Sequence, residues 1–171
     1  DITTLLECSS LSEFHDTATG LYNRQGIVNE LKNALKNAAP GDSLAVVALR
    51  AGLLSDDSNI DGKGLAVRID SEIADCLKRS AVRSGCFCAR IGDRLFLFAA
   101  VGSLPPNYPD AVSDRLDTLI SHSPLYSQHR GFGTVVTSSD TATAADADPE
   151  LIISRLCADV EKKVCALSDT S

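Results

Sequence analysis

Short apolar runs and helical stripes alternate along most of this chain. Residues 27–38 carry apolar side chains every three or four positions, which predicts a helix that Pro40-Gly41 ends. Residues 44–49 form a continuous apolar run, which is typical of a strand buried on both faces. After a polar, turn-forming segment at 55–64, a second helical stripe predicts a helix over 65–83.

The rest of the pattern predicts a hairpin and three further elements. Two apolar runs, 87–91 and 95–101, flank a tight connection at Gly92-Asp93-Arg94 and predict a β-hairpin. The remaining elements follow in chain order: helix 112–120, strand 132–137, a loop of small polar residues at 138–147, and a helix opening at Asp148-Pro149-Glu150. This order predicts an α+β fold, with helices packed on a mainly antiparallel sheet.

The N-terminus differs from the rest of the chain. Residues 1–14 have the apolar spacing of a helix end, and a polar turn segment follows. We therefore expect residues 1–15 to be an N-terminal linker helix and residues 16–171 to be a single domain. The sequence does not begin with Met, so we also expect it to be a piece of a longer protein.

The charge balance excludes several classes of partner. The net charge is −7 and the sequence pI is about 4.8. An acidic surface repels nucleic-acid phosphates and anionic lipids, so we expect no nucleic acid and no direct membrane contact. The longest apolar runs are far too short to cross a bilayer. A cytoplasmic domain is the expectation, although a longer parent protein could still be anchored in a membrane.

The cysteines do not form a recognisable metal or disulfide pattern. The chain has six of them, and Cys86 and Cys88 form a Cys-x-Cys whose side chains share one face of the expected strand. A second cluster at zinc-ligand spacing is missing from the sequence. We expect reduced, packed cysteines, and no metal or cofactor.

Two motifs at a defined separation resemble those of one family. Residues 16–24 (DTATGLYNR) are similar to the D-x-L-T-G-L-x-N-R segment that opens GGDEF domains, with Ala18 in place of the Leu. Residues 89–96 (ARIGDRLF) resemble the A-R-L-G-G-D-E-F hairpin of that family. The resemblance extends to about residue 166. It implies a ferredoxin-like nucleotidyl-cyclase fold, in which two domains each hold one GTP and condense the pair into cyclic di-GMP.

The resemblance also implies where metal-binding carboxylates should stand, and this chain lacks them. Arg50 stands where the family has its metal Asp, and Gly52 where a second Asp usually follows. In the signature Gly92-Asp93-Arg94-Leu95-Phe96, Arg94 and Leu95 replace the two acidic residues, and Asp93 replaces a glycine. Phosphoryl chemistry of this type depends on carboxylate-held divalent metal. We therefore expect a vestigial active-site loop, no catalytic residues and no cyclase activity.

Other family positions are also altered. The guanine-recognising Asn and Asp align with Ser58 and Val67, or with Asn59 and Arg68 after a shift of one residue. The phosphate-contacting Lys aligns with Ala166. Neither register restores the missing Asp.

The arginines leave alternatives open. Arg50 and Arg94 could bind phosphate directly, because a guanidinium matches phosphate geometry, or they could pair with Asp56, Asp57 or Asp93. Arg83 keeps the first residue of the family's inhibitory R-x-x-D site, but Cys86 replaces its Asp. Arg83 is thus a candidate cyclic di-GMP contact or a surface residue at a helix end.

Three hypotheses of function follow from the resemblance. The first is an inactive GGDEF-like domain that acts as a regulatory or dimerising module, fused to a neighbour such as an EAL or sensor domain. The second is a non-catalytic sensor of GTP or cyclic di-GMP. The third is an atypical active diguanylate cyclase.

Overall fold

A computed structural model of the 171-residue chain describes residues 13–51, 62–81, 85–123 and 135–169. Within these residues, eight elements follow one another: α2 (Arg24–Lys36), β1 (Ser43–Ala51), α3 (Gly62–Ser80), β2 (Cys86–Gly92), β3 (Leu95–Gly102), α4 (Tyr108–Ser121), β4 (Val135–Thr143) and α6 (Pro149–Asp169). This is the order that the sequence pattern predicts.

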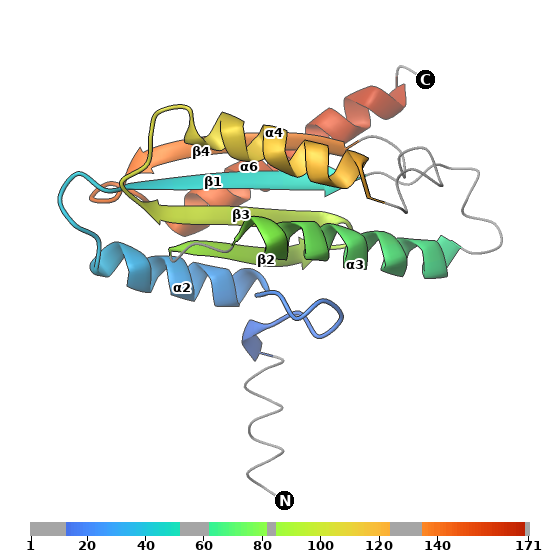
Figure 1. The fold of residues 1–171 in the computed structure, drawn as a ribbon, viewed down its shortest axis with the longest axis horizontal. Coiled ribbons are helices and arrows are strands. Elements are labelled where there is room, and N and C mark those ends of the chain that lie inside the picture. Colours follow the sequence, from blue (N-terminus) through green and yellow to red (C-terminus); the bar gives the residue numbers. More distant parts are fainter. Residues whose placement is uncertain (1–12, 52–61, 82–84, 124–134, 170–171) are drawn as a thin grey trace, which may run out of the picture.

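The strands form one four-stranded sheet with the order β2-β3-β1-β4, and each neighbouring pair is antiparallel (Figure 1). Strand β1 is central, and Leu44 to Leu49 within it are all buried, as expected for a continuous apolar run. The predicted α+β class with a mainly antiparallel sheet is confirmed.

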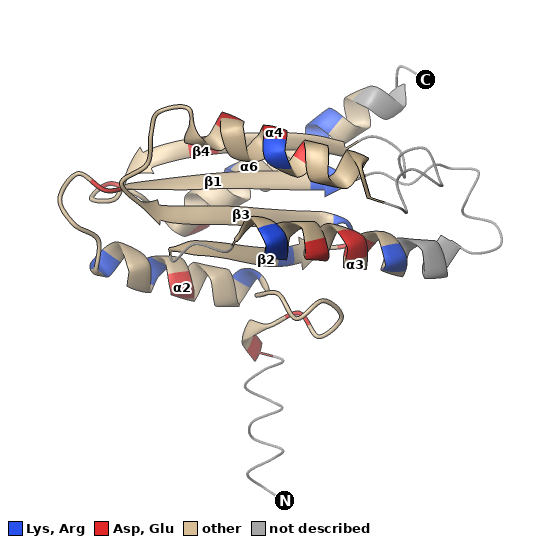
Figure 2. Ribbon diagram, viewed as in Figure 1, with Lys and Arg blue, Asp and Glu red and all other residues tan. Residues whose placement is uncertain are grey.

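Helices cover both faces of the sheet and create two cores. On one face, α3 and α4 pack over a cluster that contains Ile73, Phe96 and Leu116. On the other face, α2 and α6 pack over a cluster that contains Ile27, Leu97 and Ile153. Charged residues gather on the helices, while most of the sheet is uncharged (Figure 2). Successive side chains of a strand point to opposite faces of the sheet, so alternate residues contribute to the two cores.

One boundary differs from the sequence-based expectation. The segment 138–147 was expected to be a loop, but β4 continues to Thr143. Its backbone pairs with β1 over the whole length, from Ala51↔Val135 to Ser43↔Thr143. Tertiary pairing with the central strand therefore overrides the loop-like composition.

The N-terminal linker helix falls mostly outside the described residues, which begin at Glu13. In the described part of the chain, no helix combines the length and the apolar character that a membrane crossing requires.

Candidate functional site

The end of β1 lies beside the β2–β3 hairpin turn. Arg50 is the register partner of Leu95, and the backbone N–H of Ala51 donates to the carbonyl of Arg94 at 2.9 Å. The structure therefore brings together Arg50, Arg94 and Leu95, three of the residues singled out from the sequence. Gly52 and Arg83 lie outside the described residues.

The guanidinium of Arg50 is engaged by helix α6. Its Nε donates to Oε1 of Glu161 at 2.8 Å, and its Nη1 donates to the carbonyl of Ala51. The Arg50 side chain is only 20% exposed. Sequence reasoning missed Glu161, because it lies 111 residues away on the helix that covers this end of the sheet. Asp56 and Asp57, two of the expected partners, lie outside the described residues.

The hairpin turn places Arg94 in an unusual backbone conformation. Its φ is +56°, the only positive φ among the described non-glycine residues. The signature position that precedes it, Asp93, is 77% exposed and pairs with Arg90 at 3.0 Å. The tight connection predicted for this hairpin is confirmed. The pairing of β2 and β3 shifts in register between Arg90 and Gly92. The turn that follows contacts α3, because the backbone N–H of Arg94 donates to Asp70.

Arg90 holds three carboxylates from three separate segments, a group we call the Arg90 cluster. Its Nη1 donates to Oδ1 of Asp16 at 2.9 Å, and its Nη2 donates to Oδ2 of Asp70 at 2.6 Å. Nη2 also reaches Oδ1 of Asp93 at 3.0 Å. One guanidinium therefore links the segment before α2, the middle of α3 and the hairpin turn.

Asp70 is the buried member of the cluster. Its side chain is 5% exposed, and it accepts hydrogen bonds from the Arg90 guanidinium and, at 3.1 Å, from the backbone N–H of Arg94. Burial raises the pKa of Asp70 above its ordinary value, although the hydrogen bonds from Arg90 oppose this shift. Sequence reasoning missed Asp70. Its position three residues before Ile73, on the core side of α3, was the available signal.

The segment that resembles the family's opening motif forms a turn around Asp16. Its Oδ2 accepts hydrogen bonds from the backbone N–H and the hydroxyl of Thr19, at 2.9 and 2.7 Å. Gly20 closes the turn with a φ of +79°. Burial acts to raise the pKa of Asp16, but the hydrogen bonds from Thr19 and Arg90 outweigh it and hold the pKa below its ordinary value.

This motif segment also joins the sheet and α2. The backbone of Tyr22 pairs with β2, donating to the carbonyl of Cys88 and accepting from the N–H of Arg90. Asn23 then caps α2, because its Oδ1 accepts from the N–H of Gly26 at 2.9 Å. The motif thus connects the incoming chain, the hairpin and the first helix.

Most of the charged side chains at this end of the sheet form ion pairs with one another. The three carboxylates around Arg90 share one guanidinium, and Arg50 pairs with Glu161. Within the described residues, no group of three or more His, Cys, Asp or Glu side chains is arranged to hold a metal ion. At this end of the sheet, Arg50 and the carboxylates around Arg90 are therefore already engaged in ion pairs within the protein.

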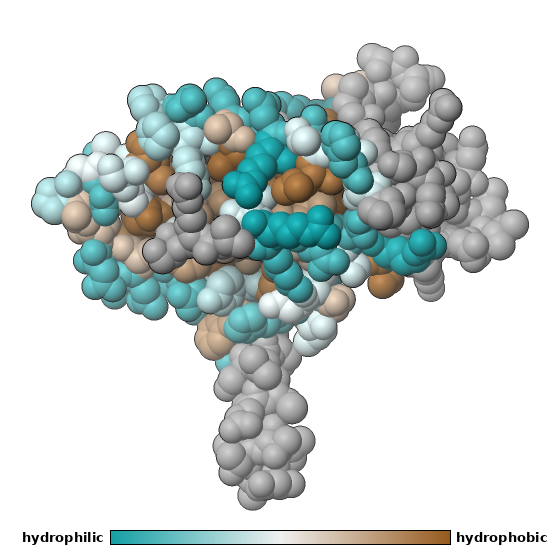
Figure 3. All heavy atoms as spheres, viewed as in Figure 1, coloured by the Kyte–Doolittle hydropathy of each residue, from teal (hydrophilic) through white to brown (hydrophobic). Residues whose placement is uncertain are grey.

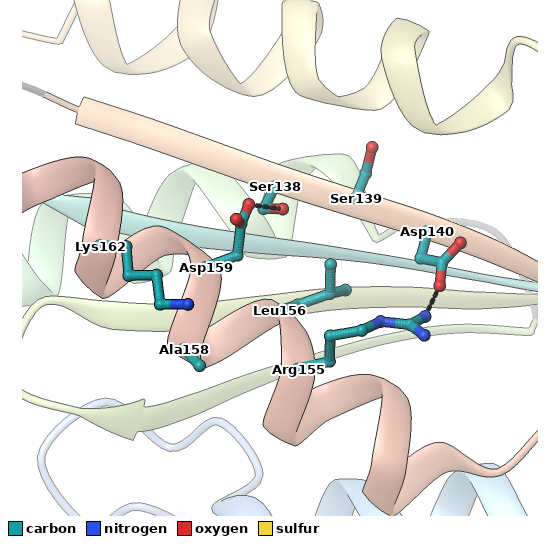
Figure 4. Close-up of a pocket in the computed structure, with 8 residues that line it drawn as sticks. All are labelled: Ser138, Ser139, Asp140, Arg155, Leu156, Ala158, Asp159 and Lys162. Carbon is teal, nitrogen blue, oxygen red and sulfur yellow. Dashed lines mark hydrogen bonds and ion pairs between the residues drawn. The ribbon is translucent and has the colours of Figure 1, made fainter.

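A hollow of about 540 Å³ lies between β4 and α6 (Figure 4). Its polar groups bind one another: the hydroxyl of Ser138 donates to Asp159 at 2.5 Å, and Arg155 forms an ion pair with Asp140. Hydrogen bonding from Ser138 lowers the pKa of Asp159. The charges that face this hollow are thus largely paired within the protein, and we assign it no ligand.

The fold is that of GGDEF domains. No protein-family model matches the chain, and no curated protein sequence matches it. Solved structures do match. The coiled coil and GGDEF domain of DgcB from Caulobacter crescentus, in complex with c-di-GMP, has a TM-score of 0.68 and 19% identity, over 92% of this chain and 83% of that chain.

Two further structures agree. The GGDEF domain of FimX from Pseudomonas aeruginosa has a TM-score of 0.67 and 18% identity, over 87% of this chain and 94% of that chain. The S helix-GGDEF-EAL portion of LapD from Vibrio cholerae has a TM-score of 0.65 and 17% identity, over 86% of this chain and 33% of that chain. At these identities the likeness establishes the fold, and the function must be argued from the site.

Proposed function

We propose that this chain is a non-catalytic GGDEF-like module that regulates a neighbouring domain in a cyclic di-GMP signalling protein. The observation that carries the proposal is Arg50. The resemblance places a metal-binding Asp at this position, and here a cation stands there, bound to Glu161 at 2.8 Å.

Charge supports the absence of catalysis. A divalent metal needs oxygen ligands, and it is repelled by guanidinium groups at short range. Arg94 occupies the signature's third position, and Asp93, the carboxylate that remains in the turn, pairs with Arg90. The proposal therefore rests on the charges at both metal-ligand positions and on the partners that Arg50 and Asp93 already have.

The Arg90 cluster supports the regulatory part of the proposal. It connects Asp16, in the segment that enters from the N-terminus, with Asp93 in the hairpin turn. A displacement of the incoming chain would change the ion pairs of the turn. The matched LapD structure carries its GGDEF domain between an S helix and an EAL domain. By analogy, an EAL or sensor domain in the same chain, a homodimer, and a cytoplasmic location belong to the proposal.

The test is product formation from GTP. We expect no cyclic di-GMP when the purified chain is incubated with GTP and Mg²⁺ or Mn²⁺, as measured by mass spectrometry beside an active cyclase. The Arg50→Asp/Arg94→Glu double variant, which places carboxylates at these two positions, is the matched comparison. Product from the unmodified chain would overturn the proposal.

A second candidate, a nucleotide sensor, is favoured by one observation. The guanidinium of Arg94 forms no ion pair with any described residue, so it remains available to a phosphate. A thermal-shift titration with GTP and with cyclic di-GMP separates the two functions. A saturable rise in melting temperature that Arg94→Ala abolishes would favour the sensor. No rise with either nucleotide would favour the purely regulatory module.

A further inference from the structure

A small pocket of about 170 Å³ opens between α3, α4 and the sheet, away from the Arg90 cluster. Phe98 and Val112 supply apolar lining, and Cys86 and Tyr108 stand beside them, with the Cys86 Sγ 3.7 Å from the Tyr108 hydroxyl. Figure 3 shows apolar atoms at the surface between the hydrophilic outer sides of α3 and α4. The pocket therefore reaches from solvent into the edge of the core.

One polar group in this pocket lacks a partner. Ser80, the last residue of α3, lines the pocket and is 8% exposed. Its Oγ has no hydrogen-bond partner in the described part of the chain. A buried hydroxyl without a hydrogen-bond partner is unfavourable, so such a group marks a place where a further donor or acceptor belongs.

A cation stands at the same pocket. Arg115 lines it from α4, and its side chain is exposed. It forms no ion pair with any residue that the structure describes. The positions three and four residues away on α4 are Ala111, Val112, Thr118 and Leu119, so no carboxylate shares its stripe of the helix. The guanidinium is thus available to an anion from solution.

We propose that this pocket binds a small monocarboxylate with an apolar body. The carboxylate pairs with Arg115, the apolar body lies against Phe98 and Val112, and a polar substituent reaches the hydroxyl of Ser80. Size limits the ligand, because a cavity of about 150 Å³ holds one benzene ring. A benzoate-sized acid fits this volume, whereas a nucleotide is far too large to enter it. Nothing in this assignment depends on the proposed regulatory function.

Water is the competing occupant. A pocket of this volume has room for several water molecules, which would satisfy Ser80 without any ligand. Water alone does not require the cation, so the charge dependence of binding separates the two cases.

The experiment uses benzoate and 4-hydroxybenzoate as probes, with benzamide as the neutral control. Binding to the whole chain is measured by ¹H–¹⁵N chemical-shift titration, which also locates the site. We expect saturable shifts at Ser80, Cys86 and Val112, with dissociation constants of about 1 mM or below for ligands of this size. Benzamide should bind at least about tenfold more weakly, because it lacks the charge.

Three variants complete the test. Arg115→Gln should weaken benzoate at least about tenfold, while Lys36→Gln, which makes the same change in net charge at an exposed site on α2, should leave binding unchanged. Ser80→Ala should weaken 4-hydroxybenzoate about threefold to tenfold and benzoate less. Ala111→Leu, which narrows the pocket from the surface of α4, should block both.

Four outcomes would overturn the proposal. They are no shifts at about 10 mM of either acid, shifts confined to other residues, benzamide binding as tightly as benzoate, and unchanged binding in Arg115→Gln. The first of these, together with an unchanged or lower melting temperature of the ligand-free Ser80→Ala variant, would assign the pocket to water, because removing a hydroxyl that water already satisfies brings no gain in stability.

Discussion

At Arg94 the backbone adopts a φ of +56°, a region that costs a residue with a Cβ about 1–2 kcal/mol and costs glycine almost nothing. The contacts made by its backbone, to Asp70 and to Ala51, need no side chain. We therefore expect Arg94→Gly to raise the free energy of unfolding by about 1 kcal/mol, measured by urea denaturation. Arg94→Ala removes the same charge but keeps the Cβ. A glycine variant no more stable than the alanine variant would contradict this account.

Within the Arg90 cluster, Arg90 and Asp70 should be strongly coupled. Asp70 is buried, so Arg90→Leu leaves a carboxylate without its counter-ion and should cost about 3–5 kcal/mol of stability. Combining it with Asp70→Asn should cost much less than the sum of the single changes. The matched cycle pairs Arg90→Leu with Asp93→Asn. Because the Asp93 side chain is exposed, its coupling with Arg90 should be at most about 1 kcal/mol. Equal coupling energies in the two cycles would contradict the claim that Arg90 is coupled more strongly to Asp70 than to Asp93.

The two carboxylates on either side of Arg90 should respond to acid in opposite directions. The pKa of Asp16 lies below its ordinary value of 3.8, so the unfolded chain binds more protons and the stability it contributes is lost as pH falls through that range. The pKa of Asp70 lies above 3.8, so the folded chain binds more protons, and its contribution rises as pH falls from the folded pKa toward 3.8.

Denaturation between about pH 6 and pH 3 tests this prediction. Asp16→Asn should lose less stability on acidification than the unmodified chain, and Asp70→Asn should lose more. Parallel pH profiles for the two variants would contradict it, whatever their stabilities at neutral pH.

Some helices and strands can be predicted from their own residues, and others depend on contacts with distant parts of the chain. Strand β1 and the β2–β3 hairpin follow from continuous apolar runs and a turn, and they were predictable. The second half of β4 reads Ser-Ser-Asp-Thr-Ala-Thr, a composition shared with loops. Its strand conformation comes from backbone pairing with β1, which no pattern within the segment can indicate.

Among the described residues β4 is an edge strand of the sheet, and side chains protect its outer edge. This protection can be tested. In an antiparallel edge strand, alternate residues direct backbone groups away from the neighbouring strand. Lys163 donates to the carbonyl of Thr137 at 2.7 Å, and Asp140 accepts from the N–H of Thr141 at 2.8 Å. Charged residues at an edge discourage pairing with another chain. We expect Lys163→Ala/Asp140→Ala to increase concentration-dependent self-association, measured by sedimentation velocity.

Lys162→Ala is the matched control for this edge, because it removes a neighbouring charge of α6 that contacts the hollow but no edge carbonyl (Figure 4). If this control associates as strongly as the double variant, the loss of a charged side chain on this face, and not edge protection, explains the effect.

For the molecule as a whole, the candidate site depends on residues that sequence reasoning could only partly select. Arg50, Asp93 and Arg94 were marked by their positions in motifs, and the structure places them at one end of the sheet. Glu161, the partner of Arg50, and Asp70, the partner of Arg90, lie on helices far from them in the sequence. A single sequence contains no signal for which carboxylate will neutralise which guanidinium, because that choice depends on how the helices pack on the sheet.

Packing also fixes the segment before Asp16 against helix α2, and this contact can be tested. Gly26 lies in α2, where replacement by alanine normally stabilises a helix by about 1 kcal/mol. Here a Cβ would stand 2.0 Å from the carbonyl oxygen of Phe14, so the segment before Asp16 would have to move. We expect Gly26→Ala to destabilise the chain and to speed hydrogen exchange at Asp16 and Asn23, whose amides bond within this segment. Gly92→Ala, whose Cβ meets only ordinary contacts, is the control.

If the turn of the hairpin also exchanges faster in Gly26→Ala, the Arg90 cluster transmits the displacement. Faster exchange confined to the N-terminal segment would mean that the two ends of the cluster move independently, and the regulatory proposal would lose its physical connection.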